Sequence, residues 1–318
     1  TIPSNTLSKT VTVKVNGDTD DEYPSENLYL LVSNTVNGQI GDVSGKGTII
    51  DDDGIPATKT WSGTGYWTNS ALWSPAGKPR PIDDAVISSG NVLLKCPETA
   101  AVVTVQNGAT FTFTNWTTFL RTTNVVVQGG GIITHAGPFN APTIPVPIAM
   151  SNRVHIVCKD LTVNTNGQIH ANSKGYTPTY GPGAGGNESG GGHGGKGGRG
   201  RGTPVVGVEY DSPSAPFTAG SGGSAAGDRN GGGAIRIEAS GTVKVWGTIS
   251  ANAVNTGSDA GAGAGGSIWI NCGVLAGSTN GLLQANGGAA NGVGGSGAGG
   301  RIAVIYNTVS QAAAGNPG

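Results

Sequence analysis

The chain has 318 residues and 58 glycines, against an average glycine usage of about 7%. Only 12% of residues are charged and the net charge is −1, which excludes a charge-rich disordered chain, and the lack of a strict glycine at every third position excludes collagen. No apolar run is long enough for a membrane-spanning helix, the charge does not favour nucleic acid as a partner, and the three cysteines exclude a disulfide-stapled mini-protein.

Residues 1–54 are acidic, with three lysines and nine acidic residues, and their apolar residues alternate as in half-buried strands. The stretches TVTVKV (10–15), NGDTDDE (16–22) and GTIIDDD (47–53) resemble the C-terminal half of a Calx-β domain. The resemblance implies a partial immunoglobulin-like sandwich and calcium as a cofactor, because Ca²⁺ prefers several carboxylate ligands. The implied ligands are Asp18, Glu22, Glu26, Asp51, Asp52 and Asp53. The alternative is a solvated acidic end with nothing bound.

The first strands of that family have no counterpart in this sequence. A sandwich without them has an unpaired sheet edge, and such edges recruit strands from elsewhere. We therefore expect the rest of a longer polypeptide, or other copies of this chain, to complete it.

Residues 55–84 form a tryptophan-rich linker or cap that contains Trp61, Trp67 and Trp73. The stretches TWSGTG (60–65) and DDAVI (83–87) resemble the opening of secreted bacterial β-helix proteins and autotransporter-like adhesins. The end of a stack of strands leaves an open apolar core, which aromatic side chains can cover. The alternative function of these tryptophans is a platform on which carbohydrate stacks.

Residues 85–318 contain a repeat of strand-like runs and glycine-rich loops. Units begin at Ile235, Ile268 and Ile302, which follow one another at nearly equal intervals, and an earlier unit begins at Val154. The interval from Val154 to Ile235 is longer because it contains the main insertion, 175–233. A single unit cannot bury its apolar face, whereas stacked units share one core. The sequence therefore predicts an all-β fold in which a right-handed parallel β-helix carries glycine-rich loops.

Strand alternation assigns the side chains of each unit to two faces. We expect Cys158, Ala239 and Cys272 to occupy one position of successive coils inside the core, too far apart for a disulfide between the cysteines. The residues expected to point out are Arg236, Glu238, Trp269 and Asn271. The residues expected at stacked corners, hydrogen-bonded from coil to coil, are Asn172, Asn252 and Asn286.

The insertion contains a G-G-x pattern in which an extended helix with three residues per turn would align His193, Lys196 and Arg199. Its bare glycine edges are expected to hydrogen-bond to the loops 261–266 and 292–300. Together with Arg201, the three basic residues form a candidate site for an anion such as an acidic polysaccharide. The alternative is pairing within the protein, with the acidic residues Glu188, Glu209, Asp211 and Asp228.

No catalytic residue is assigned. The acidic residues of 59–318 are scattered, and His135, His170 and His193 have no nucleophile at a motif spacing. We expect a non-catalytic structural or adhesive module, extracellular or at the cell surface, that belongs to a large protein or a fibre. The alternatives are a polysaccharide lyase or glycoside hydrolase on the same scaffold, or a glycan-binding module. Neither nucleic-acid binding nor membrane insertion is expected.

Overall fold

The computed structural model describes residues 10–15, 26–33, 42–49, 55–138, 150–201, 205–224, 229–256 and 259–310. The chain divides into two compact units, Thr1–Pro56 and Ala57–Gly318. The described residues form strands, loops and one short 3₁₀ helix, and none of them belongs to a helix that could cross a membrane.

The described part of the smaller unit contains one antiparallel pair, β1 (Glu26–Leu31) and β2 (Ser44–Ile49). Large apolar side chains of β1 are exposed, with Tyr29 at 60% and Leu31 at 71%. A two-stranded ladder with exposed apolar side chains is marginally stable by itself. The strand expected near Leu28 is present as β1, but residues 10–15, where alternation also predicted a strand, are exposed and form none. The sandwich implied by the resemblance stays a prediction.

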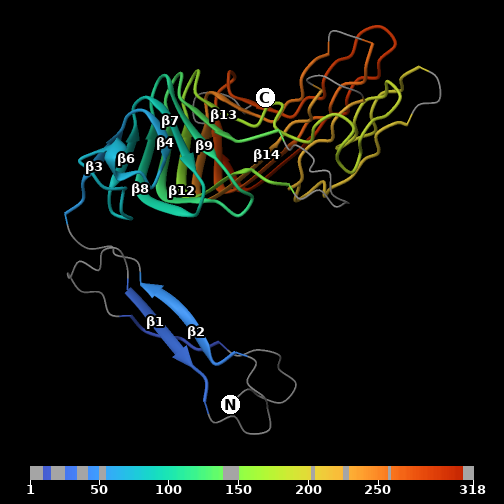
Figure 1. Ribbon diagram of the computed structural model, residues 1–318. Helices are drawn as coiled ribbons and strands as arrows, with labels where there is room; N and C mark the ends of the chain where they lie inside the picture. The colour runs from blue at the N-terminus through green and yellow to red at the C-terminus, as the bar shows by residue number, and fades with distance from the viewer. Residues whose placement is uncertain are drawn as a thin grey trace. The chain divides into compact units, whose positions relative to one another are not determined.

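The larger unit contains two sheets, between which the chain alternates from β6 to β17 (Figure 1). The first has the order β18-β16-β14-β12-β10-β8-β6-β3-β5, and all its ladders are parallel except that of β3 with β5. Its strands are β3 (Thr58–Trp61), β5 (Trp73–Ser74), β6 (Asp84–Ile87), β8 (Glu98–Val105), β10 (Leu120–Val127), β12 (Val154–Val163), β14 (Ala234–Val245), β16 (Ser267–Gly277) and β18 (Arg301–Ser310).

The second sheet is parallel throughout, with the order β17-β15-β13-β11-β9-β7-β4. Its strands are β4 (Thr64–Tyr66), β7 (Gly90–Leu94), β9 (Ala109–Phe113), β11 (Ile132–His135), β13 (Gln168–His170), β15 (Thr248–Ser250) and β17 (Leu282–Gln284). The short 3₁₀ helix η1 (Ser70–Leu72) precedes β5. We call the two sheets together the stack.

The register of the stack confirms the predicted repeat. Ile235 lies opposite Ile268, which lies opposite Ile302, so the first residues of the predicted units are stacked directly on one another. Cys158 lies opposite Ala239, which lies opposite Cys272, and all three cysteines of the chain are free. The residues assigned to the core are buried there, because alternate side chains of each strand point between the two sheets.

The predicted asparagine corners are also confirmed. The backbone N–H of Asn252 donates to Oδ1 of Asn172 at 2.8 Å, and that of Asn286 donates to Oδ1 of Asn252 at 2.7 Å. Each side chain thus satisfies a backbone donor of the next coil, at the point where a strand passes into a glycine-rich loop.

The N-terminal end of the stack is covered by tryptophan, as predicted. Trp61, Trp67 and Trp73 are at most 2% exposed and pack edge to face, and Nε1 of Trp73 donates to the carbonyl of Trp67 at 2.8 Å. Because their faces are buried, they offer no platform for carbohydrate. At the other end, Ile302 and Tyr306 of β18 stand in line with the buried Ile268 and Cys272 and yet remain 40% and 45% exposed.

Extended glycine-rich segments lie beside the stack and form what we call the glycine-rich lobe: residues 175–201, 205–224, 229–233, 259–266 and 285–300. Backbone hydrogen bonds join them, as expected: Gly191 donates to Ala262, Gly194 to Gly299 and Gly198 to Ser296. In Figure 1 the yellow-green and orange loops accordingly lie side by side. A Cβ on Gly297 would lie 1.8 Å from the carbonyl oxygen of Gly263, so these two segments approach each other too closely for a side chain at this position.

Candidate functional site

The acidic residues that would bind calcium fall mostly outside the described residues. Asp18, Glu22, Asp51, Asp52 and Asp53 lie there, and Glu26 is the exposed first residue of β1. Within the described ranges, no group of three or more His, Cys, Asp or Glu side chains could hold a metal ion. The calcium site therefore stays a prediction.

The basic edge predicted for the insertion is divided in the structure. Lys196, Arg199 and Arg201 are exposed, and Nη2 of Arg201 lies 3.3 Å from Oε1 of Glu188. His193, by contrast, is fully buried and cannot meet a ligand with them. The expectation of one basic edge is corrected at this residue, because the ring finds hydrogen-bond partners inside the lobe.

His193 lies in a buried polar cluster that joins three segments of the lobe to the first residue of β16. Its Nδ1 is 2.7 Å from the carbonyl oxygen of Gly265, and its Nε2 is 3.4 Å from Oδ2 of Asp211 and 3.3 Å from Oγ1 of Thr218. Burial alone would raise the pKa of Asp211, but hydrogen bonds from His193, Thr218 and Ser212 outweigh it and hold this pKa below the usual range. The cluster therefore contains a buried carboxylate that fixes the lobe in place.

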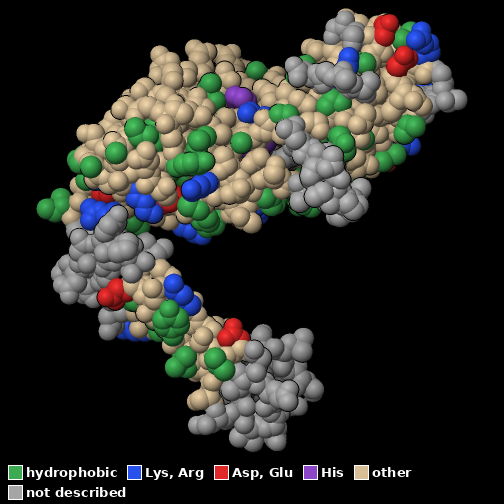
Figure 2. All heavy atoms as spheres, in the orientation of Figure 1, with side chains coloured by type: hydrophobic (Ala, Val, Ile, Leu, Met, Phe, Trp, Pro, Cys, Tyr) green, Lys and Arg blue, Asp and Glu red, His purple; other side chains and the backbone are tan. Residues whose placement is uncertain are grey.

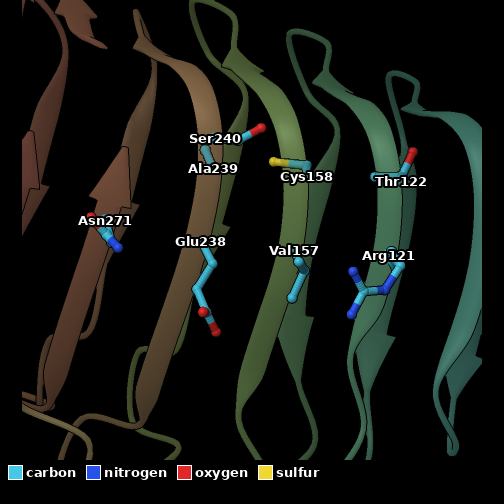
Figure 3. Close-up of a pocket in the computed structure, with 8 residues that line it drawn as sticks. All are labelled: Arg121, Thr122, Val157, Cys158, Glu238, Ala239, Ser240 and Asn271. Atoms are coloured by element: carbon cyan, nitrogen blue, oxygen red, sulfur yellow. The ribbon is translucent and has the colours of Figure 1, made fainter. Parts of the chain in front are cut away.

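Most of the face of the larger unit that Figure 2 shows is backbone or uncharged polar side chains, with charged side chains only in places. A depression of about 400 Å³ on the outer face of the nine-stranded sheet contrasts with this surface (Figure 3). By the outer face we mean the side away from the core. Arg121, Val157, Glu238 and Asn271 follow one another across β10, β12, β14 and β16 in register and line the depression.

The other residues that line the depression are Thr122, Cys158, Ala239 and Ser240, of which Cys158 and Ala239 direct their side chains into the core. Cys158, Ala239 and Ser240 lie where β12, β14 and β16 change register, between Cys158 and Leu161 and between Ala239 and Thr242, so the sheet is irregular at the depression. Burial raises the pKa of Cys158 to about 12, and Asp160 adds to this effect, so the thiol is protonated and is no nucleophile at neutral pH.

A hydrogen-bonded network borders the depression. Nη2 of Arg153 is 3.2 Å from Nδ1 of His155, which must accept because a guanidinium only donates. Nε2 of His155 and Nε of Arg236 then both donate to Oε1 of Glu238, each at 2.8 Å. Burial, Arg153 and Arg236 lower the pKa of His155 despite Glu238, and Arg236 followed by His155 lowers the pKa of Glu238. At neutral pH this is a neutral imidazole beside a fixed carboxylate.

Trp269 follows the predicted alternation but differs in exposure. It points away from the core, as predicted, yet it is only 7% exposed. The guanidinium of Arg236 lies 4.1 Å from the centre of its ring and covers it. Trp269 is therefore a buried support of Arg236 rather than an accessible aromatic surface.

Some polar groups of the depression are engaged within the protein and others are open to a ligand. Both nitrogens of His155 are occupied, Glu238 is held in its ionised form, and Cys158 is protonated. The groups open to a ligand are the guanidinium of Arg121, for which the described residues provide no carboxylate partner, and the exposed Asn271. Glu238 adds a second oxygen, Oε2, which has no hydrogen bond within the described part of the chain.

Sequence reasoning placed Arg236, Glu238, Trp269 and Asn271 on the outer face but did not identify a site there. The signal was present in the aligned units, because charged and aromatic residues recur at their outward positions. Arg121 could not be assigned to this site from the sequence, because it lies on β10, before the first of the aligned units. Comparison of the chain with protein-family models, curated proteins and solved structures finds no match.

Proposed function

We propose that Ala57–Gly318 is a right-handed parallel β-helix and that the protein is a non-catalytic structural and adhesive module of a large extracellular or cell-surface protein or of a fibre. A continuous core from Trp61 to Ile270 makes the stack a stiff element. The resemblance of its opening segment to secreted β-helix adhesins supports the location.

One observation carries the adhesive part of this proposal. The depression on the outer face offers cationic, carboxylate and amide groups to a ligand, while both nitrogens of His155 are hydrogen-bonded and the thiol of Cys158 is protonated. Among the described residues that line the depression Glu238 is the only carboxylate, whereas a glycoside hydrolase normally uses two. A surface that binds and does not react fits adhesion.

The test combines retention with product analysis. The full chain is passed over immobilised acidic and neutral polysaccharides, and the same polysaccharides are incubated with it and examined for unsaturated or reducing ends. We expect retention on at least one polysaccharide and no new ends. New unsaturated ends would identify a lyase, new reducing ends a hydrolase, and no retention on any polysaccharide would contradict glycan adhesion.

For residues 1–54 we propose a calcium-binding sandwich completed by further strands, from other copies or from the rest of a longer polypeptide. The exposed Tyr29 and Leu31 support completion, because apolar side chains of a sheet normally pack against a second layer. Binding of Ca²⁺ to clustered carboxylates would raise the melting temperature of this unit. An unchanged melting curve in excess chelator would contradict calcium binding.

A further inference from the structure

We propose that the depression on the outer face binds a carboxylate-bearing sugar residue. In this arrangement Arg121 binds the carboxylate, and Glu238 and Asn271 accept and donate hydrogen bonds with the hydroxyl groups. The inference rests on the proposed adhesive function and names the ligand class of that site.

The spacing of the groups suits one sugar residue. Arg121 and Glu238 are separated by Val157 alone, two strand spacings or about 10 Å between backbones. Their long side chains narrow this gap from both ends, as Figure 3 shows, where Arg121 and Glu238 flank the shorter Val157. A sugar ring with its exocyclic groups bridges that distance, and the side chain of Val157 provides an apolar surface for its C–H groups.

The charges favour a carboxylate sugar over other anions. Around the depression Arg121, Arg153 and Arg236 outnumber Glu238 and Asp160, so the local charge favours an anion. Glu238 remains ionised within the depression and repels a densely charged ligand such as a phosphorylated or sulfated chain. A ligand with one negative charge at one end and hydroxyl groups at the other can pair its charge with Arg121 and donate hydrogen bonds to Glu238.

The network around Glu238 gives the site its fixed geometry. Oε1 receives hydrogen bonds from His155 and Arg236, and Arg236 is itself supported by Trp269, so Oε2 is presented in one direction. Arg121 is less constrained, since its guanidinium lies 5.7 Å from the centre of the Phe119 ring, compared with 4.1 Å between Arg236 and Trp269. No aromatic ring lines the depression, so a single site binds weakly and firm adhesion requires many copies.

The experiment titrates the full chain with oligogalacturonate, with its methyl ester and with the neutral galactose oligomer, by calorimetry or NMR. We expect the acid to bind better than the ester or the neutral sugar. Arg121→Gln should weaken binding of the acid about tenfold and remove this preference, because a charged hydrogen bond contributes at least about 1.5 kcal/mol. Lys244→Gln, an exposed cation on β14 outside the depression, should change nothing.

Several outcomes would overturn the inference. Equal binding of polyglutamate would mean that charge alone is recognised, and a loss of affinity in Lys196→Gln with none in Arg121→Gln would place the site on the lobe. Retention of the chain on polysaccharide that is unaffected by Arg121→Gln would overturn this inference but leave the adhesive function standing. Failure of the wild-type chain to bind any saccharide would count against both.

Discussion

The stack and the glycine-rich lobe are held together in opposite ways. In the stack, branched and aromatic side chains fill the space between two sheets, and Ile237 and Phe111 are fully buried there. In the lobe, the segments approach so closely that a Cβ on Gly223 would lie 2.0 Å from the carbonyl oxygen of Gly261. Backbone hydrogen bonds and close Cα–H contacts replace the apolar core.

The comparison shows what limits each kind of packing. The interior of the stack accepts apolar residues of suitable volume but not an unpaired charge. The lobe has room for almost no side chain where its segments touch. Its formation also orders many glycines, and glycine loses more conformational entropy on folding than any other residue. A charge added inside the stack and a methyl group added in the lobe therefore test the two kinds of packing separately.

The largest effect is expected from a charge inside the stack. Ile237→Asp places a carboxylate without a partner in the core and should cost about 5 kcal/mol of unfolding free energy. Lys244→Asp introduces the same residue on the outward face of the same strand, β14, and should change stability by less than about 1 kcal/mol. Urea unfolding followed by circular dichroism measures both, and equal tolerance would contradict the assignment of faces.

A single methyl group should disrupt the lobe. Gly297→Ala forces its Cβ against the carbonyl of Gly263 and should cost about 4 kcal/mol. Gly299→Ala, two residues away, meets nothing within 4 Å and should cost at most about 1 kcal/mol. Hydrogen exchange at the amides of the lobe checks the difference, and protection that is the same in both variants would show that the lobe is not packed through its backbone.

Acid should weaken the stack before the lobe. Burial lowers the pKa of His135 to about 3, against the hydrogen bond to the carbonyl of Ala136, which raises it. The unfolded chain takes up this proton near pH 6.5, so it binds more protons than the folded chain between about pH 6.5 and 3, and stability falls as the pH falls through that window. By pH 4 the loss amounts to about 3 kcal/mol.

In the lobe the corresponding group is Asp211, whose pKa is lowered, so its contribution is lost only below about pH 4, where the unfolded carboxyl is protonated. Urea unfolding at pH 7, 5.5 and 4 tests the histidine effect, and a further measurement at pH 3 tests Asp211. His135→Gln should reduce the pH dependence of the unfolding free energy above pH 4. A smaller pH dependence should remain, because burial also lowers the pKa values of His155 and His170. An unchanged slope in this variant would show that His135 is not the source.

The smallest effect is expected where the two regions join. Asn252→Ala removes the acceptor of the hydrogen bond from the backbone of Asn286 and should cost about 1 kcal/mol. Asn280→Ala, at an exposed turn, is the control, because only its backbone N–H forms the hydrogen bond seen there. Thermal melting should separate the two variants by a few degrees, and identical melting temperatures would mean that the corners add no stability.

The periodic features of the fold could be predicted from the sequence. The nearly equal intervals between units predicted the register of Ile235, Ile268 and Ile302, and alternation predicted the buried position of Cys158, because both depend on local geometry repeated along the chain. The tryptophan cap followed from the same argument, since a stack needs a covered end.

Contacts that depend on one distant partner could not be predicted. His193 is buried because Gly265 and Asp211 meet it in three dimensions, and no periodicity relates these positions. Trp269 is covered because an arginine happens to stand at the same register on the next strand. The depression brings Arg121 toward Glu238 through parallel pairing of β10, β12 and β14, which the sequence suggests only after the coils are aligned.

The insertion between β13 and β14 has a consequence for synthesis on the ribosome. In the nine-stranded sheet, the strands from β6 to β18 lie in the order in which they are translated. Each new strand of this sheet therefore pairs with the edge of a strand that has already been made. The step from Val154 to its partner Ile235 is the exception, because the whole insertion must be translated between them. At about 5–20 residues per second, β12 waits roughly 4–16 s for its neighbour. During that interval its backbone edge is open to strands of other nascent chains, and Lys159, exposed on β12, is the kind of edge residue that discourages such pairing.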